Sequence, residues 1–191
     1  MARLANRADR GLQTERQLRD ILVTLIREKG YSQVSRKDIT DRAQIDRTTF
    51  YLHFRDKDDL YSRCRRAVID ELMELRAARS DSWPGIQVTF EHMARNSELW
   101  LALFMSEGIA SPGDDLQDYI ARGMTPILEG QLAEGGIARP ELLEPLAHYL
   151  TGALRGLARW WLEAGRPMDT EAISALFLRL AATGIKSLEQ R

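Results

Sequence analysis

Residues 35–57 of the 191-residue chain read SRKDITDRAQIDRTTFYLHFRDK, and this stretch decides the fold of the N-terminal part. Ser35 is a predicted cap of a short helix over Arg36–Ala43, because Asp38 places an acidic group in its first turn. After a brief turn, a second short helix is predicted over Arg47–His53. Two such helices bury little apolar surface by themselves, so they need a third helix behind them.

The third helix is predicted immediately upstream of this stretch. Apolar residues recur there at helical spacing and share one face: Leu18, Ile21, Leu22, Leu25 and Ile26. Thr14 is the predicted N-cap of this helix and Gly30 its predicted end. Four apolar side chains of the short helices are expected to face it, namely Ile39, Ala43, Phe50 and Phe54. The pattern predicts a three-helix domain with a helix-turn-helix.

The other side chains of the two short helices are expected to point outward: Arg36, Lys37, Arg47, Thr48, Thr49, Tyr51 and His53. Arginine can read guanine edges and hydroxyl groups can bind phosphates, so this surface suits duplex DNA. A helix of this size fits the major groove. Taken singly, Tyr51 could be partly core and Lys57 an ordinary surface charge, but their joint occurrence favours DNA.

The distribution of charge supports this interpretation. Residues 1–66 carry 16 Lys and Arg against 10 Asp and Glu, a net charge of +6. Residues 67–191 carry 11 against 18, a net charge of −7. A basic part beside an acidic part suggests that the basic part meets a polyanion, although composition alone also permits chance segregation.

Composition also excludes several classes of protein. The single cysteine, Cys64, permits neither a disulfide within the chain nor a cysteine-based zinc site, and it fits a reducing compartment. The N-terminal segment lacks the apolar core of a signal peptide, and no apolar run reaches the roughly 18 residues of a membrane span. We therefore expect a cytoplasmic protein with no membrane segment.

The rest of the chain is expected to be helical as well. Further helices are predicted over 56–79, 85–95, 97–109, 114–134 with a bend at Pro126, 140–165 and 170–188. The fold class is therefore all-α, with about nine helices. The clearest break is at 80–84. The predicted domains are a DNA-binding domain over 1–66 and an effector-binding and dimerisation domain over 67–191, with helix 56–79 shared as a connector.

Residues 48–61, which read TTFYLHFRDKDDLY, resemble the TetR family of transcriptional regulators. Gly30, Tyr31, Ile39, Ala43 and Ile45 also match the pattern of that family. The resemblance is specific over about residues 14–66 and architectural beyond them. It implies a helix-turn-helix regulator that binds an operator as a homodimer.

The resemblance also implies roles for individual residues. Those matching Thr49, Tyr51 and Lys57 hold the DNA backbone in the family. Five more are implied to lie near base edges or adjacent phosphates, namely Arg36, Lys37, Arg47, Thr48 and His53. Gln44 departs from the family, which usually has glycine there, and we expect its backbone to accept the turn at a positive φ.

The C-terminal part contains all four tryptophans, together with phenylalanines and methionines. Ligand pockets are mostly apolar with a few polar groups, so we expect a small-molecule effector to bind here. The candidate effector-binding residues are Phe90, Trp100, Phe104, Tyr119 and Trp160. Polar candidates are Glu98, Glu107, Asp118 and Arg122. For most of the apolar residues, a simple core role is the alternative.

Two glycines of the C-terminal part, Gly152 and Gly156, lie one helical turn apart. Small residues at this spacing let another helix approach closely. That helix can belong to a second copy of the chain, because the family dimerises through its last two long helices, here about 140–164 and 170–188. It can equally belong to the same chain, and the sequence leaves both alternatives open.

Enzymatic function is not expected, because the chain has no phosphate-binding loop, nucleophile elbow, zinc-protease motif or dinucleotide fingerprint. Glu144 and His148 are four residues apart and could begin a metal site, but no third ligand is evident, so neither metal nor cofactor is expected. The sequence favours a repressor released from its DNA operator by a small molecule. The alternative is a dimeric helical protein that acts through protein contacts, or an activator without ligand-triggered release.

Overall fold

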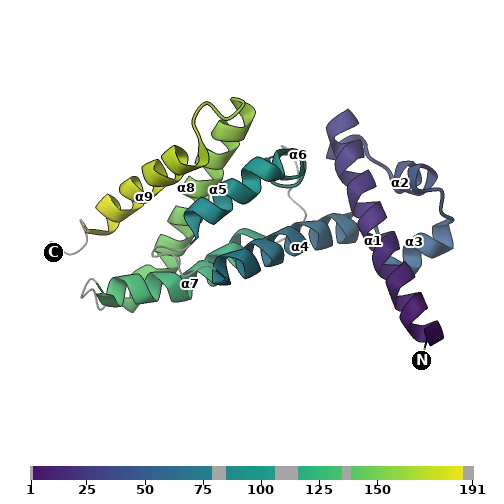
Figure 1. The fold of residues 1–191 in the computed structure, drawn as a ribbon, viewed down its shortest axis with the longest axis horizontal. Coiled ribbons are helices and arrows are strands. Elements are labelled where there is room, and N and C mark those ends of the chain that lie inside the picture. The colour runs from purple at the N-terminus through teal and green to yellow at the C-terminus, as the bar shows by residue number, and fades with distance from the viewer. Residues whose placement is uncertain (1, 79–84, 106–115, 135–138, 187–191) are drawn as a thin grey trace. The chain divides into compact units, whose positions relative to one another are not determined.

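A computed structural model describes residues 2–78, 85–105, 116–134 and 139–186, and throughout these ranges the secondary structure is helical, without strands (Figure 1). The α-helices are α1 (Ala2–Lys29), α2 (Arg36–Ala43), α3 (Arg47–His53), α4 (Lys57–Ala77), α5 (Ile86–Arg95), α6 (Ser97–Trp100), α7 (Leu116–Glu134), α8 (Leu143–Glu163) and α9 (Thr170–Lys186). The short turns are η1 (Tyr31–Gln33), η2 (Leu101–Met105, a π-helical turn) and η3 (Pro140–Leu142). The predicted all-α class is confirmed.

The chain divides into two compact units. The first, called the head, consists of Met1–Val68 and Glu98–Asp114, and the second, called the body, consists of Ile69–Ser97 and Asp115–Arg191. Helix α4 contributes residues to both units. The sequence places a boundary after residue 66 but assigns α6 and η2 to the second domain, whereas here they group with the head.

Local capping defines both short helices of the head at the predicted residues. Ser35 and Asp38 form a reciprocal capping box at the start of α2, and the Ser35 backbone N–H donates to the Asp38 carboxylate at 2.7 Å. At the start of α3, the Thr49 backbone N–H donates to the Asp46 carboxylate at 2.6 Å. Between them Gln44 adopts φ 54° and ψ 39°, so the predicted left-handed conformation is confirmed.

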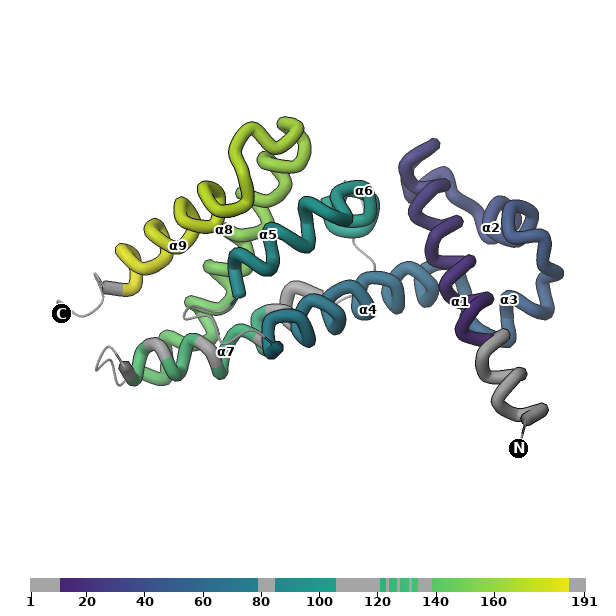
Figure 2. The backbone as a smooth tube through the Cα atoms, in the orientation of Figure 1, coloured from purple at the N-terminus to yellow at the C-terminus, as the bar shows by residue number. Residues whose placement is uncertain are grey.

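The core of the head lies where α1 packs against α2 and α3 (Figure 2). Leu18 and Leu22 of α1 are fully buried, as are Ile39 and Phe50 of the short helices. Helix α1 ends at the predicted Gly30, which has φ 79°. The predicted start at Thr14 is wrong, because α1 begins at Ala2. The segment before Thr14 contains no proline and several good helix formers, so the helix extends through it.

Helix α6 and turn η2 join the head through polar and aromatic contacts. The Arg27 guanidinium of α1 forms an ion pair with Glu98 of α6 at 2.7 Å. The guanidinium of Arg65 in α4 lies 5.5 Å from the centre of the Phe104 ring, and Phe104 stacks on Trp100 of the same segment with ring centres 4.3 Å apart. The helix predicted over 97–109 is therefore an α-helical turn followed by a π-helical one, and residues 106–109 lie outside the described ranges.

In the body, α5 packs against α9 and α7 packs against α8 (Figure 2). Phe90 of α5 meets Trp161 of α8 edge to face, with ring centres 5.4 Å apart. The Trp161 indole N–H donates to the Met168 carbonyl at 2.8 Å. Asp169 caps α9 by accepting the Ala172 backbone N–H at 2.7 Å.

The prolines of α7 and α8 take different positions. Pro126 lies inside α7, and Pro145 lies in the first turn of α8, where its missing N–H removes no helical hydrogen bond. The predicted break at 80–84 falls outside the described residues. Among the helices that are described, none is long and apolar enough to cross a membrane.

Candidate nucleic-acid interface

Four exposed side chains of α2 and α3 are either positively charged or carry a hydroxyl group. Lys37 of α2 and Arg47 and Thr48 of α3 are exposed, and Tyr51 of α3 is 47% exposed. We call these four residues the outward cluster. Within the described part of the chain, neither Lys37 nor Arg47 has an ion-pair partner. Their charges therefore remain available to an external anion such as a phosphate.

Arg36 links the first short helix to the second. Its guanidinium donates a hydrogen bond to the phenol oxygen of Tyr51 and lies 5.1 Å from the centre of the Tyr51 ring. Arg36 itself is half-buried, so its charge is placed beside the phenol rather than projected away from it. This contact restricts the rotamer of Tyr51 and presents the phenol beside a positive charge.

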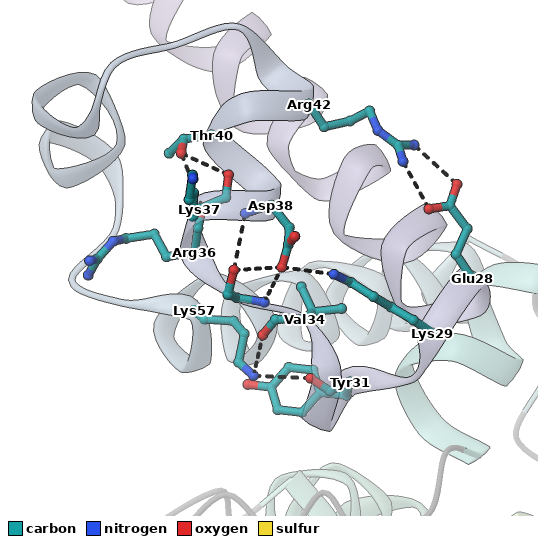
Figure 3. A network of polar contacts seen from close by, with 11 residues as sticks. Glu28, Lys29, Tyr31, Val34, Arg36, Lys37, Asp38, Thr40, Arg42 and Lys57 are labelled. Carbon is teal, nitrogen blue, oxygen red and sulfur yellow. Dashed lines mark hydrogen bonds and ion pairs between the residues drawn. The ribbon is translucent and has the colours of Figure 1, made fainter.

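Lys57 occupies a different position from the outward cluster. Its ammonium donates to the carbonyl oxygens of Tyr31 at 3.1 Å and Val34 at 2.8 Å, and it lies 4.0 Å from the centre of the Tyr31 ring (Figure 3). The Tyr31 phenol in turn donates to the Asp58 carboxylate. Burial and this carboxylate raise the pKa of Tyr31 above its ordinary range. Lys57 thus ties the turn before α2 to the start of α4.

His53 and Thr49 are less exposed than the sequence suggests. The Nδ1 atom of His53 lies 3.3 Å from the Glu15 carboxylate of α1, and the His53 side chain is only 16% exposed. Its expected outward orientation is wrong, because the end of α3 turns the ring back toward α1. Thr49 is half-buried, and its backbone N–H is occupied by Asp46.

Acidic side chains around the short helices have partners inside the head. Asp38 forms an ion pair with Lys29 at 2.9 Å, and the Ser35 and Lys29 hydrogen bonds hold its pKa far below the ordinary range. Glu28 accepts two hydrogen bonds from Arg42, at 2.9 and 3.1 Å, which lower the pKa of Glu28 (Figure 3). Because these carboxylates are already paired with cations inside the head, they neutralise the positive charge of the outward cluster less than unpaired carboxylates would.

Helix α3 has one exposed apolar residue that the sequence pattern does not predict. Leu52 is 75% exposed and follows Tyr51 directly. An apolar residue in a short helix is ordinarily expected in the core, so the sequence alone does not single it out. The helical position does, because Thr48 lies one turn earlier on the same exposed side of α3.

The five candidate effector-binding residues are distributed over both units of the chain. Phe90 is fully buried in the body, whereas Trp100 and Phe104 belong to the head. Trp160 is 48% exposed on α8, and the side chain of Tyr119 lies outside the described ones. In the described ranges, no group of three His, Cys, Asp or Glu side chains is placed to hold a metal ion.

Family models match both parts of the chain. Residues 20–64 match the model described as bacterial regulatory proteins, tetR family. Residues 81–183 match the model described as transcriptional regulator C-terminal region. The TetC protein of transposon Tn10 from Escherichia coli is 32% identical over 68 residues. That match spans 34% of this chain and 34% of the TetC protein, so it covers about a third of either.

Solved structures extend the similarity to nearly the whole chain. A TetR-family regulator from Syntrophomonas wolfei is 20% identical and superposes with a TM-score of 0.72, covering 91% of this chain and 95% of that one. The fatty acid degradation regulator FadR from Bacillus halodurans, also 20% identical, gives a TM-score of 0.68 and covers 88% and 94%. Helix order, the capped helix-turn-helix and both family models agree: this chain belongs to the TetR family of bacterial transcriptional regulators.

Proposed function

We propose that this chain represses transcription by binding an operator as a homodimer, and that a small molecule releases it. The main support for DNA binding is the outward cluster. Its cations Lys37 and Arg47 lie on two capped helices, and within the described ranges neither has an ion-pair partner. Phosphate contacts from such residues fix the position of a protein on DNA, and base contacts select the sequence. The chain would act by binding rather than by catalysis.

Within this proposal the surface residues of α2 and α3 divide between two tasks. Arg47 and Leu52 read bases, since arginine pairs with a guanine edge and an apolar side chain contacts the methyl group of thymine. Lys37, Thr49 and Tyr51 contact the phosphate backbone. His53 and Lys57 act from behind the surface, because both have partners inside the head.

Binding to random-sequence duplexes, followed by selection of the preferred operator, tests the proposal. Lys37→Ala is expected to weaken binding to all duplexes alike, whereas Arg47→Ala lowers preference at particular base pairs by about 1 to 3 kcal/mol. Affinity falls steeply with salt, as expected for counterion release. Arg42→Ala is the matched control, because Arg42 is paired with Glu28 and extends from a different side of α2 than Arg36 (Figure 3). DNA affinity that does not respond to salt would refute this assignment.

The dimer is proposed to form through an exposed apolar face of α8 and α9. Tyr149 and Trp160 of α8 are 68% and 48% exposed, and Leu180 of α9 is 64% exposed. A Cβ atom added at Gly152 or Gly156 would meet no atom of the described chain within 4 Å. Among the described residues no other helix packs against these two positions, which supports the alternative in which the glycines accommodate a partner.

Substitution of these glycines tests the dimer directly. Gly152→Glu and Gly156→Glu place a charge on the proposed interface and are expected to yield monomers in light scattering. Gly130→Glu on α7 is the control, since a Cβ there also meets no atom within 4 Å and the change in charge and helix propensity is the same. A wild-type monomer at micromolar concentration, or a glycine variant that stays dimeric, would contradict the proposed interface.

Release by an effector is proposed to act through α4, because that helix contributes residues to both head and body. If a ligand shifts α4, the separation of the two recognition helices in the dimer changes, and they no longer fit two half-sites together. The coupling is reciprocal: operator DNA weakens ligand binding by the same factor by which the ligand weakens DNA binding. We expect a coupling free energy of about 1 to 3 kcal/mol. Measuring each affinity in the presence of the other partner tests this step.

A further inference from the structure

A cavity of about 270 Å³ lies between α7 and α8 in the body. Its lining residues are Ala121, Arg122 and Thr125 of α7, and Glu144, Ala147 and His148 of α8. The volume corresponds to the share of about nine water molecules in the liquid. This is room for a molecule the size of an amino acid, and three of the six lining side chains are ionisable.

Two opposite charges face this cavity from different helices. Arg122 belongs to α7 and Glu144 to α8, and no ion pair joins them. Across the described residues neither side chain has another ion-pair or hydrogen-bond partner. Because these two opposite charges do not pair with each other, each is available to a complementary charge on a ligand.

The apolar residues that line the cavity are both alanines. Ala121 and Ala147 are 3% and 1% exposed, so the two helices approach each other there through methyl groups. The Thr125 hydroxyl donates to the Ala121 carbonyl at 3.1 Å and is thereby satisfied within its own helix.

One helical turn beyond the cavity lining, α8 contains a buried polar side chain. Thr151 follows Ala147 by one helical turn and is 6% exposed. Its hydroxyl oxygen is buried without a hydrogen-bond partner in the described part of the chain. A threonine inside a helix ordinarily donates to the carbonyl four residues earlier, so a buried hydroxyl that does not is available to another acceptor or donor.

We propose that this cavity binds a small amino carboxylate, with its carboxylate on Arg122 and its ammonium on Glu144. Arginine binds carboxylates through two parallel hydrogen bonds, which fixes their orientation. A simple anion is disfavoured by Glu144 and a simple cation by Arg122, whereas a zwitterion is complementary to both. The identification of this molecule as the effector rests on the proposed function, but the binding site itself does not.

Calorimetric titration of the full chain with individual L-amino acids tests the site without DNA. We expect at least one of them to bind. Its N-acetyl derivative, which lacks the ammonium, and its amide, which lacks the carboxylate, are expected to bind roughly tenfold or more weakly, because each loses a charge-assisted contact. Equal binding of all three forms would contradict recognition of a zwitterion, and no binding by any amino acid would overturn the proposal.

Substitution of the charged lining residues tests whether the amino acid binds in this cavity. Arg122→Gln and Glu144→Gln each remove one charge from an exposed position and are expected to weaken binding by roughly tenfold to a hundredfold. The charge-swapped double variant Arg122→Glu with Glu144→Arg restores opposite charges and is expected to recover part of the affinity. Arg95→Gln on α5 and Glu74→Gln on α4 are controls with the same charge changes outside the cavity. Unchanged affinity in both single variants would overturn the assignment.

The DNA measurements separate this inference from the proposed function. If an amino acid binds but leaves operator affinity unchanged, the site stands and its identification as the effector site fails. If no amino acid binds while the outward cluster still binds operator DNA, the inference fails and the proposed DNA-binding function stands. Loss of DNA binding in Arg47→Ala bears only on the head.

Discussion

The phenol oxygen of Tyr61 on α4 donates a 2.6 Å hydrogen bond to the backbone carbonyl oxygen of Leu103, which lies 42 residues further along the chain. Leu103 lies in the π-helical turn η2 of the head. Both residues are buried, at 2% and 0% exposed. This hydrogen bond anchors a segment of the C-terminal half of the sequence to the DNA-binding unit.

Tyr61→Phe removes the donor and leaves the Leu103 carbonyl without it, which is expected to lower the free energy of unfolding by about 1 to 2 kcal/mol. Chemical denaturation followed by circular dichroism measures the change. Tyr51→Phe is the control, because Tyr51 is 47% exposed and its phenol contact with Arg36 lies at the surface, and its effect should stay within about 0.5 kcal/mol. Equal stabilities of the two variants would show that the hydrogen bond to Leu103 contributes little.

Gln44→Gly is expected to stabilise the protein. The left-handed conformation at Gln44 costs a residue with a Cβ atom about 1 to 2 kcal/mol, and the greater chain entropy of unfolded glycine offsets about half of this. A net gain of about 0.5 to 1 kcal/mol in the free energy of unfolding follows, measured by denaturant titration. Gln44→Ala retains the Cβ atom and should give no gain. Destabilisation by glycine would contradict the strain inferred at this turn.

Arg36 and Tyr51 are expected to act on DNA affinity as a unit, because the guanidinium holds the phenol. Fluorescence anisotropy with Arg36→Ala, Tyr51→Phe and the double variant forms a double-mutant cycle. The double variant is expected to lose less affinity than the two single losses combined, with a coupling of about 0.5 to 1.5 kcal/mol. Additive losses would mean that each residue contacts DNA independently.

Stability is expected to depend on the protonation of His92. This residue of α5 is 3% exposed, and burial lowers its pKa, while Glu71, with a carboxylate oxygen 3.7 Å from the His92 Nε2 atom, partly opposes the shift. The unfolded chain then binds more protons than the folded chain at pH values below its ordinary pKa of about 6.5. The free energy of unfolding should therefore fall as the pH falls below that value.

Urea unfolding at a series of pH values measures this dependence. In His92→Gln the residue does not titrate, so the decline of stability with falling pH should be shallower than in the wild type. Glu71→Gln removes the opposing charge and should make the decline steeper. Parallel curves for wild type and His92→Gln would show that the imidazole does not contribute.

Much of the head was predictable because its determinants are local. The capping box of Ser35 and Asp38, the Asp46 cap and the left-handed Gln44 each depend on residues within a few positions, and the bounds of α2 and α3 follow from them. The extent of α1 was less predictable. Thr14 is a good cap in isolation, but nothing before it ends the helix.

The sequence by itself determined the all-α class, the helix-turn-helix and the exposure of the cations Lys37 and Arg47, because helical periodicity and caps are properties of neighbouring residues. Tertiary structure decided which side chains from distant parts of the sequence become neighbours. It turned His53 toward Glu15, assigned Trp100 and Phe104 to the head, and placed Arg122 across a cavity from Glu144. These relationships join residues far apart in the sequence, and an apolar or charged residue has the same helical spacing whether it faces a core, a partner or a ligand.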